Sequence, residues 1–223
     1  MQDKRLVNGS IAATRPAVEI NKVLKNTYML LGMTLLFSAM TAGVAMAVGL
    51  SPMMGLGLML GAFVSLFVVH KTADSGKGLM WIFVFTGLMG ASLGPTLSFY
   101  LQLANGPALV TQALGGTAII FFALSGYALT SRKDFSFMGG FLFVGLMVAL
   151  VAGIANIFLG IPALSLALSA AIILIMSGLI LFDTSRIIHG GETNYIRATV
   201  SLYLSIYNIF INLLALLGIM GDD

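Results

Sequence analysis

The sequence contains no cysteine and few charged residues. Among its 223 residues, the absence of cysteine excludes disulfide bonds, thiolate metal sites and a cysteine nucleophile. Only 9% of the residues are charged, whereas 59% are hydrophobic. A soluble domain carries about 25% charged residues, so this chain has too few charges to cover a globular surface in water. The composition therefore predicts a protein whose main partner is the lipid bilayer.

Titratable residues are also scarce inside the apolar segments. The two histidines, His70 and His189, both fall at the ends of apolar runs. An intramembrane serine protease needs a histidine beside a buried serine, and an aspartyl protease needs two buried acids, of which only Asp183 qualifies. Neither histidine belongs to a cluster with metal-ligand spacing, and no glycine-rich phosphate loop follows a strand. The sequence therefore predicts no enzyme, no metal site and no cofactor.

Seven apolar runs are long enough to cross a bilayer as helices. A hydrocarbon core of about 30 Å needs about 20 residues of α-helix. We predict an all-α membrane protein with a seven-helix transmembrane domain at 27–219, a polar tail at 1–26 that we expect to be disordered, and a short tail at 220–223. The predicted spans are 27–49, 53–70, 79–101, 108–130, 137–159, 163–188 and 196–219.

The basic residues are sorted to one side of these spans. All 11 lysines and arginines precede the first span or lie between spans two and three, four and five, or six and seven. The other connections carry none, and the chain ends in Asp222 and Asp223. The positive-inside rule places the basic side in the cytoplasm. We therefore predict that the N-terminus is cytoplasmic and the C-terminus is not, and the net charge of +3 indicates membrane orientation rather than a nucleic-acid partner. The basic residues are Lys4, Arg5, Arg15, Lys22, Lys25, Lys71, Lys77, Arg132, Lys133, Arg186 and Arg197.

Asp183 is the only acid inside an apolar helical run. Charge is unfavourable in lipid, so an ionisable residue at this depth is a candidate functional site. Two interpretations stay open. In the first, Asp183 exchanges protons in the physiological range and acts as a gate or pH sensor. In the second, it forms a plain ion pair with Arg186, which lies on the same helix face at i+3.

The seventh span carries a polar stripe. Ser201, Ser205, Asn208 and Asn212 recur at spacings of four, three and four, so they share one helix face. Such a face is expected to pack against other helices, at the centre of the bundle. Interhelical hydrogen bonds, worth about 0.6 kcal/mol each, explain Ser201 and Asn212. Ser205 and Asn208 join Asp183 as gate candidates, because Ser205 lies at a similar depth on the neighbouring span.

Three stretches of sequence occur in order along the chain. The first is GLMGASLGPTL at 87–97, and the second is TSRKDFSFMGG at 130–140. The third runs from LFDT at 181–184 through IIHGG at 187–191 into SLYLSIYNIF at 201–210. Together with the seven spans, these stretches resemble the Bax inhibitor family, in its bacterial YccA-type branch, from about residue 21 onward.

The resemblance implies a bundle in which span seven is central and is wrapped by the other six. The resemblance also allows a comparison with channel-like members of the family, which are described as pH-sensitive calcium leaks gated by two aspartates on spans six and seven. Asp183 matches the first aspartate, but the second position is Ser205. A carboxylate opposite a hydroxyl lacks the coupled titration of two acids, and Ca²⁺ prefers six to eight oxygen ligands. Strong calcium conduction is therefore not expected.

Three classes of function follow. The YccA-type branch looks like a partner of the membrane-bound FtsH protease, which implies a bacterial inner-membrane protein that modulates an FtsH-type protease through its N-terminal tail. The alternative is a leak for Ca²⁺ or protons, gated at Asp183 with Arg186, Ser205 and Asn208. The third class is a structural bundle in which Asp183 is only paired with Arg186.

Overall fold

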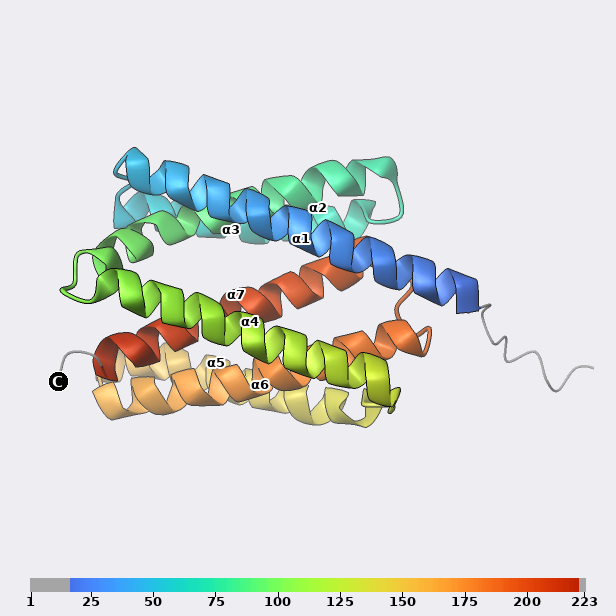
Figure 1. Ribbon diagram of the computed structural model, residues 1–223. Helices are drawn as coiled ribbons and strands as arrows, with labels where there is room; N and C mark the ends of the chain where they lie inside the picture. The colour runs from blue at the N-terminus through green and yellow to red at the C-terminus, as the bar shows by residue number, and fades with distance from the viewer. Residues whose placement is uncertain (1–16, 221–223) are drawn as a thin grey trace, which may run out of the picture.

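The computed structural model describes residues 17–220, so the predicted tail segments 1–16 and 221–223 lie outside the described residues. The described chain contains seven helices that are long and apolar enough to cross a membrane, and it contains no strand. The prediction of an all-α, seven-helix membrane protein is confirmed (Figure 1). The elements are α1 (Ala17–Ala47), α2 (Pro52–Thr72), α3 (Gly76–Leu101), α4 (Gly106–Ser131), the 3₁₀ turn η1 (Ser136–Met138), α5 (Gly139–Leu159), α6 (Pro162–Ile188) and α7 (Tyr195–Met220).

The first helix is longer than the apolar run that predicts it. α1 begins at Ala17 rather than near residue 27, so the second part of the predicted polar tail is helical. These additional turns are amphipathic, since Ile20 and Val23 are half-buried whereas Lys22 and Lys25 are exposed. A mixed face of this kind has the period of a helix but too little hydrophobicity to be found by a search for apolar runs.

The connections between helices gather at two ends of the bundle. The start of α1 and the α2–α3, α4–α5 and α6–α7 connections lie at one end, on the right in Figure 1. Every basic residue of the described chain belongs to this end, called the basic end below, which agrees with the sorting seen in the sequence. These residues are Lys22, Lys25, Lys71, Lys77, Arg132, Lys133, Arg186 and Arg197.

α7 is the helix around which most of the bundle packs. It contacts α1, α2, α3, α4 and α6, and its fully buried side chains include Leu202, Tyr203 and Ile209. The central position expected for span seven is therefore confirmed. α5 is the exception among the surrounding helices, because it packs on α6 and η1 and, within the described residues, makes no contact with α7. Five helices rather than six surround α7, and α5 forms an outer layer.

α1 and α3 approach closely because glycines of α3, including Gly90 and Gly94, face α1. A Cβ atom on Gly90 would lie 2.7 Å from the carbonyl carbon of Ser38, and one on Gly94 would lie 2.5 Å from the Cβ of Ala45. Carbon atoms pack best about 3.5–4.0 Å apart, so neither position has room for a side chain. Small residues that bring backbones together are typical of interfaces between membrane helices.

Candidate functional site at the basic end

Asp183 lies near the end of α6 and is 7% exposed. Its carboxylate accepts a hydrogen bond of 2.6 Å from the hydroxyl of Ser201 on α7. The expected neighbour was Ser205, one turn further along α7. α6 and α7 are antiparallel, and Ser201 is about as far from the start of α7 as Asp183 is from the end of α6, which brings these two residues to the same depth. Ser201, which was predicted to have only a structural role, is therefore the residue that binds Asp183.

Arg186 does not form the ion pair with Asp183 that one interpretation required. Its guanidinium lies 3.9 Å from the carboxylate of Glu192 and donates a hydrogen bond of 3.2 Å to the carbonyl of Gly191. It also lies 5.5 Å from the centre of the Phe182 ring. Within the described residues no ion pair joins Arg186 to Asp183. The spacing of i+3 places both residues on one face, but the guanidinium turns toward the α6–α7 connection.

A cavity of about 180 Å³ adjoins Asp183. It lies between α2, α6, the α6–α7 connection and α7, and it combines two guanidinium groups, two carboxyl groups and an imidazole. Such a lining favours water or a small anion over a bare cation, because the arginines repel positive charge. The polar residues that line it are His70, Asp183, Arg186, Glu192, Arg197 and Ser201.

The two other gate candidates lie deeper along α7 than this cavity. Ser205 is buried, at 2% exposure, and Asn208 donates a hydrogen bond of 2.8 Å to the carbonyl of Leu204 within its own helix. Neither residue lines the cavity at Asp183. The structure therefore brings Asp183, Arg186 and Ser201 together, while Ser205 and Asn208 belong to the interior of the bundle.

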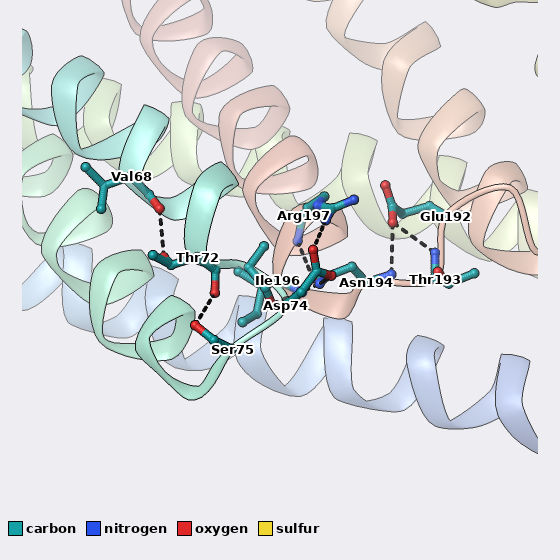
Figure 2. A network of polar contacts seen from close by, with 10 residues as sticks. Val68, Thr72, Asp74, Ser75, Glu192, Thr193, Asn194, Ile196 and Arg197 are labelled. Atoms are coloured by element: carbon teal, nitrogen blue, oxygen red, sulfur yellow. Dashed lines mark hydrogen bonds and ion pairs between the residues drawn. The ribbon is translucent and has the colours of Figure 1, made fainter.

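A polar network ties the start of α7 to the α2–α3 connection, as Figure 2 shows. Asn194 caps α7, because its side-chain oxygen accepts the amides of Ile196 and Arg197 at 2.9 and 3.1 Å. Its side-chain nitrogen donates to the carbonyl of Ala73 at 2.9 Å and to the carboxylate of Asp74 at 2.8 Å. Arg197 forms an ion pair with the same carboxylate. This network fixes the first turn of α7, which carries Ser201 one turn later.

The α4–α5 connection is held by Ser185 of α6. The Ser185 hydroxyl accepts a hydrogen bond of 2.9 Å from the amide of Phe135 and donates one of 3.3 Å to the carbonyl of Lys133. Inside the connection, hydrogen bonds from the hydroxyl and amide of Ser136 hold the pKa of Asp134 below its usual range. Two connections at the basic end are thus anchored to the α6–α7 hairpin that carries Asp183.

Two residues of this polar cluster, Ser185 and Asn194, were not among the residues predicted from the sequence. The hydroxyl of a serine in an apolar helix often bonds to a carbonyl of its own helix rather than to another element. The sequence around Ser185 therefore does not indicate that this residue holds the α4–α5 connection. Asn194 does carry a recognisable signature, because an asparagine directly before an apolar helical run is a typical helix cap.

The start of α1 lies beside the same hairpin. Glu19 and Lys22 of α1 border a cavity of about 230 Å³ together with Ile187, Gly190 and Glu192. Glu192 also lines the cavity at Asp183, so the α6–α7 connection lies between the two cavities. α1 therefore begins next to the connection that also borders the cavity at the buried acid.

The fold and the polar cluster define an integral membrane protein with a central seventh helix and a buried acid near its basic end. The model of the family described as inhibitor of apoptosis-promoting Bax1 matches residues 20–222. The chain belongs to this family, the Bax inhibitor family, and the resemblance seen in its sequence is confirmed.

Relatives of similar length occur in several bacteria. The modulator of FtsH protease YccA from Escherichia coli K12 is 53% identical over 219 residues, which cover 98% of this chain and 99% of the relative. An uncharacterised membrane protein of Vibrio cholerae is 54% identical over 207 residues, or 92% of this chain and 93% of that protein. A protein of Neisseria meningitidis serogroup B is 36% identical over 219 residues, or 94% and 96% of the two chains.

Proposed function

We propose that this protein resides in a bacterial inner membrane and modulates an FtsH-type protease. The observation that carries the proposal is the 53% identity, over 98% of the chain, to a protein named as a modulator of FtsH protease. The match covers 99% of that relative, which therefore has no additional domain to which its named activity belongs. A second Escherichia coli relative of the same identity is named an inner membrane protein, which supports the location.

The basic end is the proposed cytoplasmic end, and the residues before α1 are the proposed contact with the protease. The positive-inside rule supports this orientation. The contact is supported by the position of Glu19 and Lys22, which place the start of α1 against the α6–α7 connection. A protease that pulls on the chain before α1 applies its force to a helix that is packed tightly on α3. We infer that this packing resists extraction of the chain from the membrane, so that engagement by the protease modulates the activity of the protease.

Deletion of residues 2–16 tests the contact. The half-life of a membrane-protein substrate of the protease is measured by pulse–chase in cells that produce the full chain, the deleted chain or a chain with residues 2–16 in scrambled order. The full chain is expected to change the half-life at least twofold, and the deletion is expected to abolish the change at equal protein level in the membrane. The scrambled chain shows whether the order of the residues matters.

Two negative results have different meanings in this experiment. If the deleted chain acts like the full chain, the N-terminal contact is wrong but modulation stands. If the full chain leaves the half-life unchanged, modulation itself is wrong.

A second candidate function is a proton-sensitive leak at Asp183. One observation favours it, namely that a buried carboxyl adjoins a polar cavity. Ca²⁺ is disfavoured as the conducted ion, because Arg186 and Arg197 line this cavity and its two carboxyl groups fall short of six to eight oxygen ligands. Ion flux into liposomes between pH 6 and 8 tests the candidate. A flux that varies with pH in the wild type and not in Asp183→Asn supports it, whereas no flux in either protein removes it.

A further inference from the structure

A long cavity lies between α1 and α4, away from the site at the basic end. Its volume is about 680 Å³, within the range of pockets that bind small ligands. Tyr28 to Met46 of α1 and Val110 to Phe122 of α4 supply its walls, Tyr203 to Phe210 of α7 form its floor, and Leu93 and Leu97 of α3 complete the lining. Within the described residues the backbones of α1 and α4 do not approach closely, although the Tyr28 side chain of α1 reaches α4, and α7 is visible between their ribbons in Figure 1.

The cavity opens toward the lipid. Gly32 and Ala39 on α1 and Leu114 and Phe122 on α4 line the cavity and are also exposed on the outer surface of the bundle. Phe122, for example, is 70% exposed. The small residues on α1 leave the seam between the two helices open, so a hydrocarbon chain of the bilayer has direct lateral access.

The chemistry of the walls is that of a hydrocarbon site. The lining contains no charged residue, and its hydroxyl groups are already hydrogen-bonded within the protein. Ser38 is bonded to Tyr203 at 2.7 Å, and Tyr28 is bonded to Ser125 of α4. Because these groups have partners, the surface offered to a ligand is apolar. Burial of apolar surface is favourable relative to water and not relative to hydrocarbon, so in a membrane such a site selects its ligand by shape.

The length of the cavity fits one acyl chain. Between Tyr28 and Met46 α1 rises by about 27 Å, whereas one leaflet provides about half of the hydrocarbon thickness of about 30 Å. A single acyl chain of one leaflet therefore fits within the length of the cavity. We propose that this cavity binds one acyl chain of a membrane phospholipid, which enters between α1 and α4.

Charge at the basic end indicates the headgroup. Lys22 and Lys25 are exposed on α1 within two turns of Tyr28, where the cavity begins at that end. Basic residues beside a membrane attract anionic lipids. The bound lipid therefore carries an anionic headgroup, as in phosphatidylglycerol, placed at the basic end.

Photolabelling of the full chain in liposomes tests the proposal. The probe is phosphatidylglycerol with a diazirine on one acyl chain, and the adducts are located by mass spectrometry. Adducts are expected on Ile206 and Phe210, which are 9% and 7% exposed and are reached from lipid through the cavity. The double variant Ala39→Phe/Ala118→Phe fills the cavity and is expected to lower these adducts at least fivefold. Ala155→Phe, on the exposed face of α5, is the matched control and is expected to leave them unchanged.

Several outcomes overturn the proposal. Wild-type protein without adducts on α7, or a filled variant with undiminished adducts, shows that no acyl chain occupies the cavity. If the double variant does not fold, Ala118→Phe alone is used with the same two outcomes. A photoreactive residue at position 118 that captures another protein in place of lipid assigns the cavity to a partner helix. Equal labelling by a phosphatidylcholine probe overturns the preference for an anionic headgroup.

Discussion

Substitution of Gly90 by alanine places a methyl group between α1 and α3. That methyl carbon would lie 2.7 Å from the carbonyl carbon of Ser38 and closer still to its carbonyl oxygen. Carbon contacts are most favourable about 3.5–4.0 Å apart, so the two helices have to separate by about 1 Å. The two obstructing atoms of Ser38 belong to the backbone and cannot rotate away. The same movement disturbs the side chain of Ser38, which is hydrogen-bonded to Tyr203 at 2.7 Å.

The expected loss of stability follows from these distances. Insertion of a methyl group into a packed interface costs about 1–3 kcal/mol, and the upper end applies because backbone is the obstacle. Alanine offsets about 1 kcal/mol of this through its higher helix propensity. Gly90→Ala is therefore expected to lower the free energy of unfolding by about 2 kcal/mol. Gly57→Ala is the matched control, because Gly57 is exposed on α2 and has nothing within 4 Å of an added Cβ.

The comparison is made by thermal unfolding of both variants in detergent, followed by size-exclusion chromatography. Gly57→Ala is expected to be neutral or stabilising by up to about 1 kcal/mol, so the two variants differ by about 2–3 kcal/mol. For a chain of this size the difference corresponds to about 4–12 °C in Tm. A Gly90→Ala protein that melts at or above the temperature of Gly57→Ala would refute close α1–α3 packing.

Three further predictions concern the basic end. Asn194→Ala removes the cap of α7 and is expected to destabilise the protein by about 1–2 kcal/mol, measured by thermal unfolding against Thr193→Ala. Ser201→Ala leaves the Asp183 carboxyl without its hydrogen-bond donor and is expected to lower the free energy of unfolding by about 1–3 kcal/mol. Ser201→Thr keeps a hydroxyl and is expected to keep most of the stability. Equal melting temperatures of the two variants would show that the hydrogen bond is unimportant. Ser185→Ala is expected to raise the hydrogen-exchange rate of the Phe135 amide at least tenfold, and an unchanged rate would contradict the anchoring of the α4–α5 connection.

Most of the fold could be predicted because the bilayer limits the possible structures. Apolar runs of about 20 residues in a chain with 9% charge leave helices as the only plausible spans. The polar stripe on α7 predicted its central position for the same reason. The start of α1 could not be found in this way, because the segment that contains Lys22 and Lys25 is amphipathic. The outer position of α5 has no counterpart in the sequence either, since hydrophobicity does not distinguish lipid from a neighbouring helix.

The candidate site was predictable only in part. Asp183 stands out because it is the one acid in an apolar run, so composition alone finds it. Its partner depends on the relative depth of α6 and α7, which is set by the length of their connection, and a difference of one turn exchanges Ser205 for Ser201. The direction of the Arg186 side chain depends on the carbonyl and carboxylate groups of the α6–α7 connection. Positions fixed by contacts between connections cannot be read from helical spacing.

Orientation in the membrane is the property on which the proposed function depends most, and thiol labelling measures it directly because the chain has no cysteine. Single-cysteine variants are made at Lys77 and Lys133, which are exposed at the basic end, and at Ala104, which is exposed at the opposite end. A membrane-impermeant maleimide is expected to label only Ala104→Cys in intact spheroplasts, and all three variants after permeabilisation. Labelling of Lys77→Cys or Lys133→Cys in intact spheroplasts would place the basic end outside the cytoplasm and contradict the proposed contact with the protease on the cytoplasmic side.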